Sequence, residues 1–180
     1  MQQDDEVRIQ RVTSANAQAL KLPNEPFPLI GRMVVERTSG SWTHREMMFE
    51  EETVQTFPDE DYELGDIDAA GFALAAFAQS DCVGLATFAD RWNKYLYLDD
   101  LKVNSAWRGH GVATALLDAA RAEATKRGYR GLTTIAQDNN LWANRFYQHY
   151  GFVIGGLNTA DYNFTQQAGK ADIYYYYNFN

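Results

Sequence analysis

The sequence has little of several features that restrict what a protein can be. Among its 180 residues there is one cysteine, Cys82, so no disulfide can form within the chain. It lies in the apolar run Cys82-Val83-Gly84-Leu85 with no base close by in the sequence, which predicts a buried thiol rather than a nucleophile. Long apolar runs are also absent, and none approaches the length of a membrane span. We therefore expect neither a disulfide scaffold nor a membrane protein.

Histidine and positive charge are scarce as well. The three histidines, His44, His110 and His149, lack metal-ligand spacing, so we expect no metal site. The net charge is -8, which disfavours binding to nucleic acid and favours a cationic partner. Between Glu46 and Asp90 every charged residue is acidic. This stretch is either a solvated acidic face or an electrostatic funnel for a cationic amine.

The length and the N-terminal residues indicate how the chain is organised. The start, Met1–Glu6, is polar and acidic and lacks the apolar core of a signal peptide. A chain of this size can bury a core of its own. We expect one domain over residues 1–180, located in the cytoplasm.

The pattern of apolar residues predicts an α/β (α+β) protein with a mixed central β-sheet flanked by helices. The clearest helix covers 113–126 and ends before Gly128, and a second covers 140–150. A weak helical stretch is expected at 14–22, an acidic helix at 45–53 and a loop at 59–68. The expected strands are 7–12, 33–37, 72–78, 83–89, 95–103, 132–136, 152–154 and 173–179.

A glycine-containing turn follows the strand at 95–103 and opens the first helix near Ala113. Unpaired N–H groups and the positive end of a helix attract an anion at such a place. Gly109 and Gly111 allow the backbone to approach the anion closely, and Arg108 can add charge or brace the loop. The turn therefore predicts a site for a phosphate-bearing ligand.

Two common phosphate motifs do not describe this turn. A Walker A loop needs a Gly-Lys-Ser/Thr ending, which is missing. The run Gly109-His110-Gly111-Val112-Ala113-Thr114 begins like a dinucleotide fingerprint, but Thr114 stands where a third Gly or Ala is needed. The turn also comes late in the chain, so a dinucleotide fold is disfavoured.

In this region the sequence resembles the GNAT superfamily of N-acetyltransferases. The family's first motif, Arg/Gln-x-x-Gly-x-Gly/Ala between a strand and a long helix, is matched by Arg108, Gly111 and Ala113. Its second motif, an Asn-containing segment before a helix that ends in Phe-Tyr…Gly-Phe, resembles residues 137–152. The resemblance implies a GNAT fold.

Within the superfamily the chain is most similar to the streptothricin acetyltransferases. Their Trp-Asn-x-x-x-Tyr-Ile-Glu-Asp-Ile-x-Val pattern is echoed by residues 92–103, and their Gly-Phe-x-Ile-Gly-Gly pattern by residues 151–156. The likeness covers about residues 60–180, the expected acetyl-CoA-binding core, and residues 1–60 match poorly. Asp99 replaces a usual Glu, and Ile135 replaces a Glu on the following strand. The loss of a carboxylate bears on the acceptor and not on acetyl-CoA.

The resemblance implies acetyl-CoA as a co-substrate and assigns its binding to residues within 101–114 and within 139–147. The strand supplies Leu101, whose N–H would stabilise the oxyanion formed from the thioester carbonyl. Asn139 and Asn144 would bond the pantetheine arm, although surface or turn roles fit them equally well, and Asn140 is a candidate N-cap. The expected cofactor contacts are Leu101, Val103, Arg108, Gly109, His110, Gly111, Val112, Ala113, Thr114, Asn139, Asn144 and Tyr147.

The implied reaction is direct attack of a neutral amine on the thioester, which requires that the amine first lose a proton. Asp99 and Asp100 are neighbours on a strand, so they should point to opposite faces, and Asp99 is the favoured carboxylate. Asp100 would support it or bind substrate. Tyr147 resembles the family's general acid, which would protonate the departing thiolate. Structural roles remain the alternatives for all three.

These expectations lead to one favoured function and two alternatives. The favoured acceptor is a primary amine of a small cationic molecule such as streptothricin, acetylated in a ternary complex and so detoxified. The alternatives are a protein N-terminus, lysine or polyamine as acceptor, and an acyl-CoA-binding module without turnover. Members of the superfamily are often monomers or homodimers, and either state is expected here.

Overall fold

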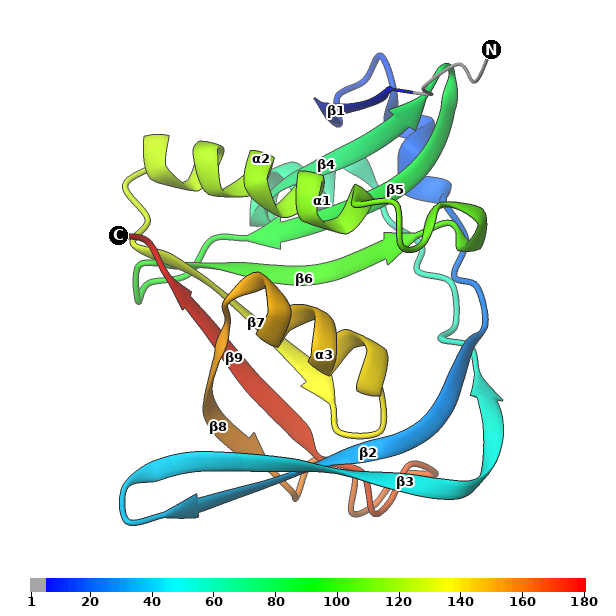
Figure 1. The fold of residues 1–180 in the computed structure, drawn as a ribbon. Helices are drawn as coiled ribbons and strands as arrows, with labels where there is room; N and C mark the ends of the chain where they lie inside the picture. The colour runs from blue at the N-terminus through cyan, green and yellow to red at the C-terminus, as the bar shows by residue number, and fades with distance from the viewer. Residues whose placement is uncertain (1–5) are drawn as a thin grey trace. The chain divides into compact units, whose positions relative to one another are not determined.

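The structure is a computed structural model that describes residues 6–180 (Figure 1). The expectation about a signal peptide concerns residues that, apart from Glu6, lie outside this range. The described chain forms two compact units, each built from two stretches of sequence. We call Met1–Glu25 with Phe57–Leu132 the first unit, and Pro26–Thr56 with Thr133–Asn180 the second unit. The expected single domain stays a prediction.

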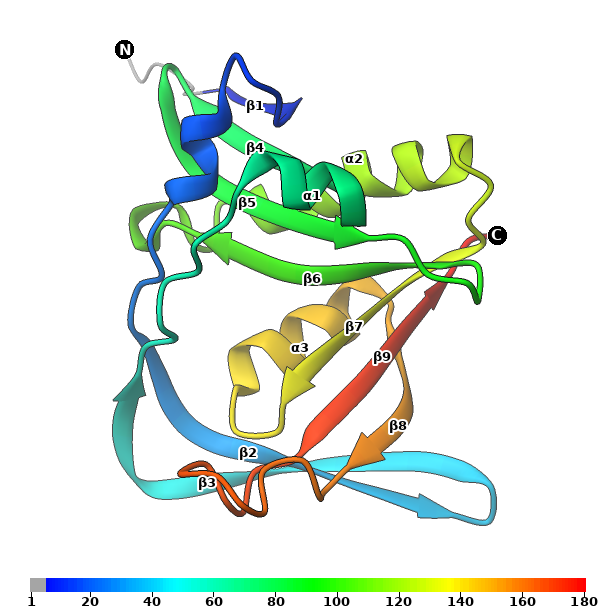
Figure 2. The same ribbon diagram turned by 180° about the vertical axis from the view of Figure 1, so that it is seen from behind.

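The first unit is built around antiparallel strands with a helix on each face. Its strand order is β1-β4-β5-β6, and α1 and α2 lie on opposite faces, as the two views show (Figures 1 and 2). Residues 72–76 of β4 are buried on both faces because both faces are covered. The elements are β1 (Val7–Arg11), η1 (Ala17–Lys21), α1 (Leu64–Ala70), β4 (Gly71–Ala78), β5 (Asp81–Ala89), β6 (Tyr95–Val103), η2 (Ser105–Trp107) and α2 (Val112–Lys126).

Helix α2 packs closely on the sheet because its apolar residues recur at helical spacing. Leu116, Leu117 and Ala120 are fully buried. A Cβ on Gly84 of β5 would lie 2.8 Å from Cγ1 of Val112, so only glycine allows the helix to approach this closely. This contact fixes the start of α2 over the sheet.

The other face of the sheet holds a second core cluster. Residues Ala73, Ala75 and Leu85 pack there with Ile67 of α1 and other buried residues. The half-buried Cys82 packs against this cluster, and burial raises the pKa of its thiol. The cysteine is therefore a packing residue, but it is half-buried and not fully buried as its apolar run predicts.

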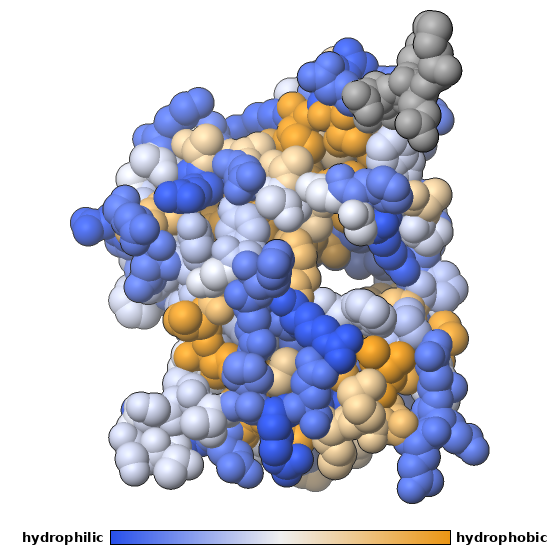
Figure 3. Space-filling model, in the orientation of Figure 1, coloured by the Kyte–Doolittle hydropathy of each residue, from blue (hydrophilic) through white to orange (hydrophobic). Residues whose placement is uncertain are grey.

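The second unit combines a long hairpin, the strands β7, β9 and β8 in that order, and one helix. Its two-residue hairpin turn has Ser39 and Gly40 at φ 52° and 83°, as a type I′ turn requires. The outward side of α3 is mainly hydrophilic (Figure 3). The elements are β2 (Phe27–Thr38), β3 (Ser41–Gln55), β7 (Gly131–Gln137), α3 (Leu141–Tyr150), β8 (Val153–Asn158) and β9 (Asp172–Asn178).

Most expected elements are confirmed, and two are wrong. Residues 45–53, expected as an acidic helix, belong to β3, because pairing with β2 outweighs their helical propensity. The loop expected at 59–68 gives way to α1 at Leu64. The stretch 14–22 contains only the 3-10 helix η1. Within the described residues, no helix is long and apolar enough to cross a membrane.

Candidate active site

The turn after β6 has the geometry that its glycines predict. Gly109 and Gly111 both adopt φ +79°, and a Cβ on either would meet no atom within 4 Å, so the backbone faces open space. Gly111 is the N-cap of α2, and no side chain caps it within the described part of the chain. The first helical bond is donated by the N–H of Ala115. The N–H groups of residues 112–114 are therefore available to an anion.

Arg108 braces this turn. Its Nε donates to the carbonyl oxygen of Val103 at 3.2 Å, and its guanidinium lies 3.8 Å from Glu25. Glu25 also accepts a hydrogen bond from the backbone N–H of Ser105, so it holds the turn from the other side. Of the two roles that the sequence left open for Arg108, the structure shows the bracing one. Its contact with a ligand stays a prediction.

The remaining predicted residues of the turn differ in exposure. His110 is exposed, and its Nδ1 lies 3.0 Å from the carbonyl oxygen of Arg108, so the ring acts as a spacer at the surface. The side chain of Val112 is buried, whereas Thr114 is exposed. Val112 can therefore contact a phosphate only through its backbone, and the contacts predicted for His110 and Thr114 stay predictions.

Strand β6 contains a bulge at the two aspartates. Phe88 pairs with Leu98 and Thr87 pairs with Asp100, so Asp99 has no partner opposite it. The expectation that Asp99 and Asp100 point to opposite faces assumed an uninterrupted strand, and this premise is wrong. Leu101 continues the ladder opposite Ala86. The bulge changes the direction of β6 at Asp99 and Asp100, where the sequence predicts the reacting carboxylate.

The two aspartates lie in different surroundings. Asp99 is exposed and has no ion pair among the described residues. The side chain of Asp100 is 19% exposed, and its Oδ2 lies 3.1 Å from the Tyr62 hydroxyl and 3.2 Å from Nζ of Lys102. Burial raises the pKa of Asp100 above its ordinary value, against the opposing effect of Lys102. Asp100 is therefore the carboxylate whose proton affinity the fold increases.

Sequence reasoning did not identify the residues around Asp100. Lys102 lies 2.5 Å from Glu60, and Asn24 donates to both Glu60 oxygens at 3.1 Å. Burial acts to raise the pKa of Glu60, but the hydrogen bonds from Lys102 and Asn24 lower it overall. The only signal in the sequence was that Asp100 and Lys102 are two apart on a strand and so share a face.

In the second unit, two asparagines before α3 play different parts. Asn140 caps the helix, since its Oδ1 accepts the N–H of Ala143 at 3.1 Å, which confirms the expected N-cap. Asn139 is 6% exposed, and its Oδ1 has no partner in the described part of the chain. A buried carbonyl oxygen without a donor fits an amide N–H of a ligand, such as those of a pantetheine arm.

Asn144 is fully used inside the unit. It is completely buried, its Nδ2 donates to the carbonyl oxygens of Gln137 and Asn140, and its Oδ1 accepts from Tyr175 at 2.6 Å. These contacts join α3 to β7 and β9. They favour the structural alternative, and the cofactor role of Asn144 stays a prediction.

Tyr147 lies inside an aromatic cluster. The residue is 7% exposed, and its ring centre lies 5.4 Å from that of Phe152 and 5.6 Å from that of Tyr175. This packing fixes the ring, as both a core residue and a precisely held acid would require.

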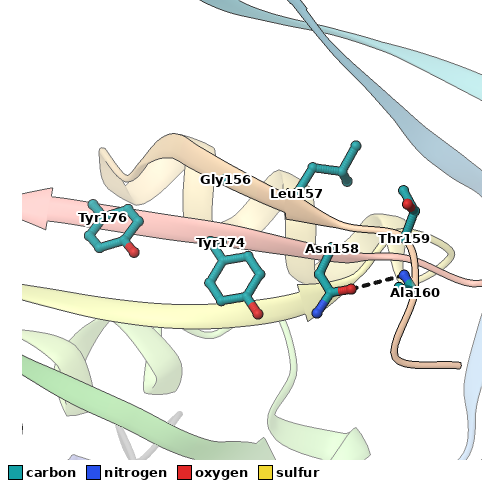
Figure 4. A pocket seen from close by; sticks show the side chains of 7 residues that line it. All are labelled: Gly156, Leu157, Asn158, Thr159, Ala160, Tyr174 and Tyr176. Carbon is teal, nitrogen blue, oxygen red and sulfur yellow. Dashed lines mark hydrogen bonds between the residues drawn. The ribbon is translucent and has the colours of Figure 1, made fainter.

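A further pocket of about 560 Å³ lies beside the end of β8 (Figure 4). Tyr174 and Tyr176 share one face of β9, and a Cβ on Gly155 would lie 2.4 Å from the Tyr176 ring, so the glycine gives that ring its place. The Oδ1 of Asn158 accepts from Ala160, which turns its amide nitrogen the other way. The lining residues are Gly156, Leu157, Asn158, Thr159, Ala160, Tyr174 and Tyr176.

No group of three or more His, Cys, Asp or Glu side chains that could hold a metal ion occurs in residues 6–180. In the first unit the phosphate turn and the bulged strand carry the candidate chemistry, and in the second unit the residues before and within α3 carry it. The predicted residues of the turn and of β6 all belong to the first unit, whereas Asn139, Asn144 and Tyr147 belong to the second unit.

Comparison with known proteins agrees with this chemistry. Residues 39–152 match the model of the acetyltransferase (GNAT) family. Streptothricin acetyltransferase A of Bacillus subtilis (strain 168) is 31% identical over 172 residues, which cover 95% of this chain and 99% of the relative. A streptothricin acetyltransferase of Escherichia coli is 29% identical over 115 residues, or 64% of this chain and 66% of the relative. The first match reaches into residues 1–60, so the likeness extends beyond residues 60–180, and the expectation that the first sixty residues diverge stays a prediction.

Solved structures extend the agreement to the fold. The crystal structure of nourseothricin acetyltransferase has a TM-score of 0.80 and 26% identity, covering 96% of this chain and 98% of its own. A Bacillus anthracis protein assigned to the streptothricin acetyltransferases, solved with acetyl coenzyme A, has a TM-score of 0.84 and 21% identity, covering 97% and 99%. The α/β fold class with a mixed sheet flanked by helices is thereby confirmed. The chain belongs to the GNAT family of acetyltransferases, and it is an acetyl-CoA-dependent N-acetyltransferase.

Proposed function

We propose that the chain transfers the acetyl group of acetyl-CoA to a primary amine of a streptothricin-type molecule and so confers resistance to it. The observation that carries the proposal is the relative named streptothricin acetyltransferase A, which is 31% identical over 95% of this chain. The net charge of -8 favours a cationic acceptor and disfavours nucleic acid. A cytoplasmic location follows, because acetyl-CoA is found inside cells.

The phosphate turn binds the diphosphate of acetyl-CoA in this proposal. The N–H groups of residues 112–114 provide the contacts, and Arg108 stiffens the turn through Val103. The N–H of Leu101 stabilises the oxyanion. The unpartnered Oδ1 of Asn139 accepts a pantetheine amide.

The acceptor amine must lose a proton before it attacks. An ammonium of lysine type has a pKa of roughly 10, so a carboxylate that binds the cation and passes its proton to water raises the reactive fraction. We assign the proton to Asp100, because the fold increases its proton affinity, and we assign the exposed Asp99 to attraction of the cation. The order of these two roles reverses the one that the sequence favoured.

Tyr147 protonates the departing thiolate in the same scheme. The rings of Phe146, Phe152 and Tyr175 pack around its ring, so the position of the Tyr147 hydroxyl is fixed. The pocket with Tyr174 and Tyr176 suits a non-reacting part of the acceptor, since tyrosine faces attract cationic and ring-shaped groups.

A thiol-release assay with acetyl-CoA tests the proposal. The acceptors are streptothricin, aminoglycosides, polyamines, lysine peptides and peptides with a free N-terminus. We expect release of CoA with streptothricin at a kcat/KM at least about tenfold above that of any other amine, a difference of about 1.4 kcal/mol in transition-state binding. Release with another class alone reassigns the acceptor. Binding of acetyl-CoA without release by any amine indicates a module without turnover.

A further inference from the structure

A buried lysine lies between two carboxylates in the first unit. The side chain of Lys102 is 9% exposed, and its Nζ lies 2.5 Å from Glu60 Oε2 and 3.2 Å from Asp100 Oδ2. The same ammonium lies 5.5 Å from the centre of the Tyr62 ring. Lysine is rarely buried unless it is paired, and the two carboxylates supply that pairing here.

The cluster joins strand β6 to the segment that precedes α1. Asp100 and Lys102 are two residues apart on one side of the strand, and Glu60 and Tyr62 are two residues apart on the facing segment. Tyr62 donates its hydroxyl to Asp100 Oδ2 at 3.1 Å. Asn24 holds Glu60 from a third segment, at 3.1 Å from both carboxylate oxygens. Tyr62 and Lys102 thus hold the carboxylate of Asp100, and Glu60 in turn holds Lys102.

The contacts use only one oxygen of Asp100. Tyr62 and Lys102 both bind Oδ2, and across the residues that the structure describes Oδ1 has no hydrogen bond or ion pair. An ionised carboxylate accepts several hydrogen bonds, so Oδ1 remains able to receive another donor.

From this geometry we infer that Lys102 is a positioning residue for the reaction: it holds Oδ2 of Asp100 and leaves Oδ1 to the ammonium of the acceptor. The inference rests on the proposed function for the identity of that ammonium. It does not rest on that function for the effect of Lys102 on Asp100, which can be measured without any acceptor.

Lys102 also affects the pKa of Asp100 through its charge. The titratable groups that face Asp100 are Lys102 on β6 and Glu60 and Tyr62 on the segment before α1. Burial raises the pKa of Asp100, Lys102 lowers it, and Glu60 raises it. Removal of the lysine charge leaves two carboxylates sharing one site, which raises the pKa of Asp100 further.

The test is a titration of Asp100 followed by carbon NMR of labelled aspartate side chains in the full chain. The resonance is assigned by its loss in Asp100→Asn. We expect Lys102→Met to raise the titration midpoint of Asp100 by about one pH unit or more, Glu60→Gln to lower it, and Lys102→Arg to leave it near the wild-type value. Lys126→Met, which removes an exposed lysine on α2, is the matched control and should change nothing.

Activity measurements connect this midpoint to catalysis. In Lys102→Met, the acid limb of kcat/KM should move to higher pH together with the NMR midpoint, with the KM for acetyl-CoA unchanged. An Asp100 midpoint that is the same in Lys102→Met and Lys126→Met overturns the inference, as does a limb that ignores a shifted midpoint. If Lys102→Met does not fold, Lys102→Gln, which also removes the charge, takes its place, and an unshifted Asp100 midpoint in it overturns the inference. A wild-type chain that acetylates no amine contradicts the proposed function, while the titration still tests the effect of Lys102.

Discussion

At the scale of single residues, Asp100 is the aspartate of strand β6 whose pKa burial raises. It is held by Tyr62 and Lys102, whereas the neighbouring Asp99 is exposed. Similar residues placed one position apart therefore receive different properties, because burial and partners decide the proton affinity of a carboxyl group. Substitutions at Asp99, Asp100 and Tyr147 separate the roles of the three residues.

Asp100→Asn should lower kcat/KM for the acceptor by about 100-fold or more, because the amide cannot take a proton. Asp99→Asn should mainly raise the KM for the acceptor, by less than about tenfold, since an exposed charge contributes attraction that solvent screens. Steady-state kinetics of both variants over a range of pH make the comparison. Asp100 must be ionised to accept a proton, so wild-type activity should fall as the pH is lowered through its pKa. Because burial raises that pKa, the fall should begin at a higher pH than for an ordinary aspartate. Asp100→Asn should not show this fall. The reverse pattern would return the principal role to Asp99.

Tyr147→Phe should lower kcat by about 100-fold and leave acetyl-CoA affinity unchanged. The substitution keeps the ring and its packing against Phe152 and Tyr175 and removes only the hydroxyl. Thiol release gives kcat, and calorimetry gives the affinity for acetyl-CoA. Tyr150→Phe, a change in the same aromatic cluster, is the matched control. Equal turnover in the wild-type chain and Tyr147→Phe would remove this tyrosine from the mechanism.

At the scale of elements, the start of α2 is the part of the site that the sequence predicts best. The strand, the glycines and the following helix are consecutive in the chain, so local chemistry determines the geometry of the turn. The hydrogen bond between Ser105 and Glu25 was not predictable in this way, because 80 residues separate the partners. The same holds for Lys102 and Glu60, which are 42 residues apart.

Gly111→Ala tests the turn against a control in the same helix. Gly111 and Gly128 flank α2 at opposite ends, both adopt φ +79°, and neither has an atom within 4 Å of an added Cβ. Each alanine should cost about 1 kcal/mol of unfolding free energy, from the strain of a left-handed residue. Only Gly111→Ala should also weaken acetyl-CoA binding, by about tenfold, because only it alters the backbone around the diphosphate.

Chemical denaturation measures the unfolding free energy of these variants, and calorimetry measures their affinity for acetyl-CoA. If both alanines weakened acetyl-CoA binding equally, the turn would have no special part in it.

The acidic helix expected at 45–53 shows where sequence reasoning fails at this scale. Its residues have helical propensity, but the type I′ turn at Ser39 and Gly40 pairs them with β2.

At the scale of the whole molecule, charge is the property that composition alone determines. The chain carries 24 acidic and 16 basic side chains. Such an excess accelerates the approach of a polycationic acceptor, and salt screens the effect. We expect kcat/KM for streptothricin to fall severalfold between about 0.02 and 0.3 M NaCl, and that for a peptide with a single amine to change less. Initial-rate assays with both acceptors at several NaCl concentrations measure this dependence of kcat/KM. An equal salt dependence for the two acceptors would contradict electrostatic attraction.

The order of elements and the family were also predictable over most of the chain, because the two motif segments are consecutive runs with fixed spacing. The division into two units was not, since each unit combines an early and a late stretch. The hydrogen bonds of Asn144, which bind Gln137 and Tyr175, belong to this tertiary level. A resemblance in sequence assigned the residue to a ligand, whereas the contacts show it fully occupied within the second unit.

The most direct test of the account is the mass spectrum of streptothricin after incubation with the protein and acetyl-CoA. We predict a product that carries one additional acetyl group on a primary amine, formed together with an equal amount of free CoA and absent when either the protein or acetyl-CoA is omitted. Unmodified streptothricin, recovered from a mixture in which the folded protein binds acetyl-CoA, would contradict the account.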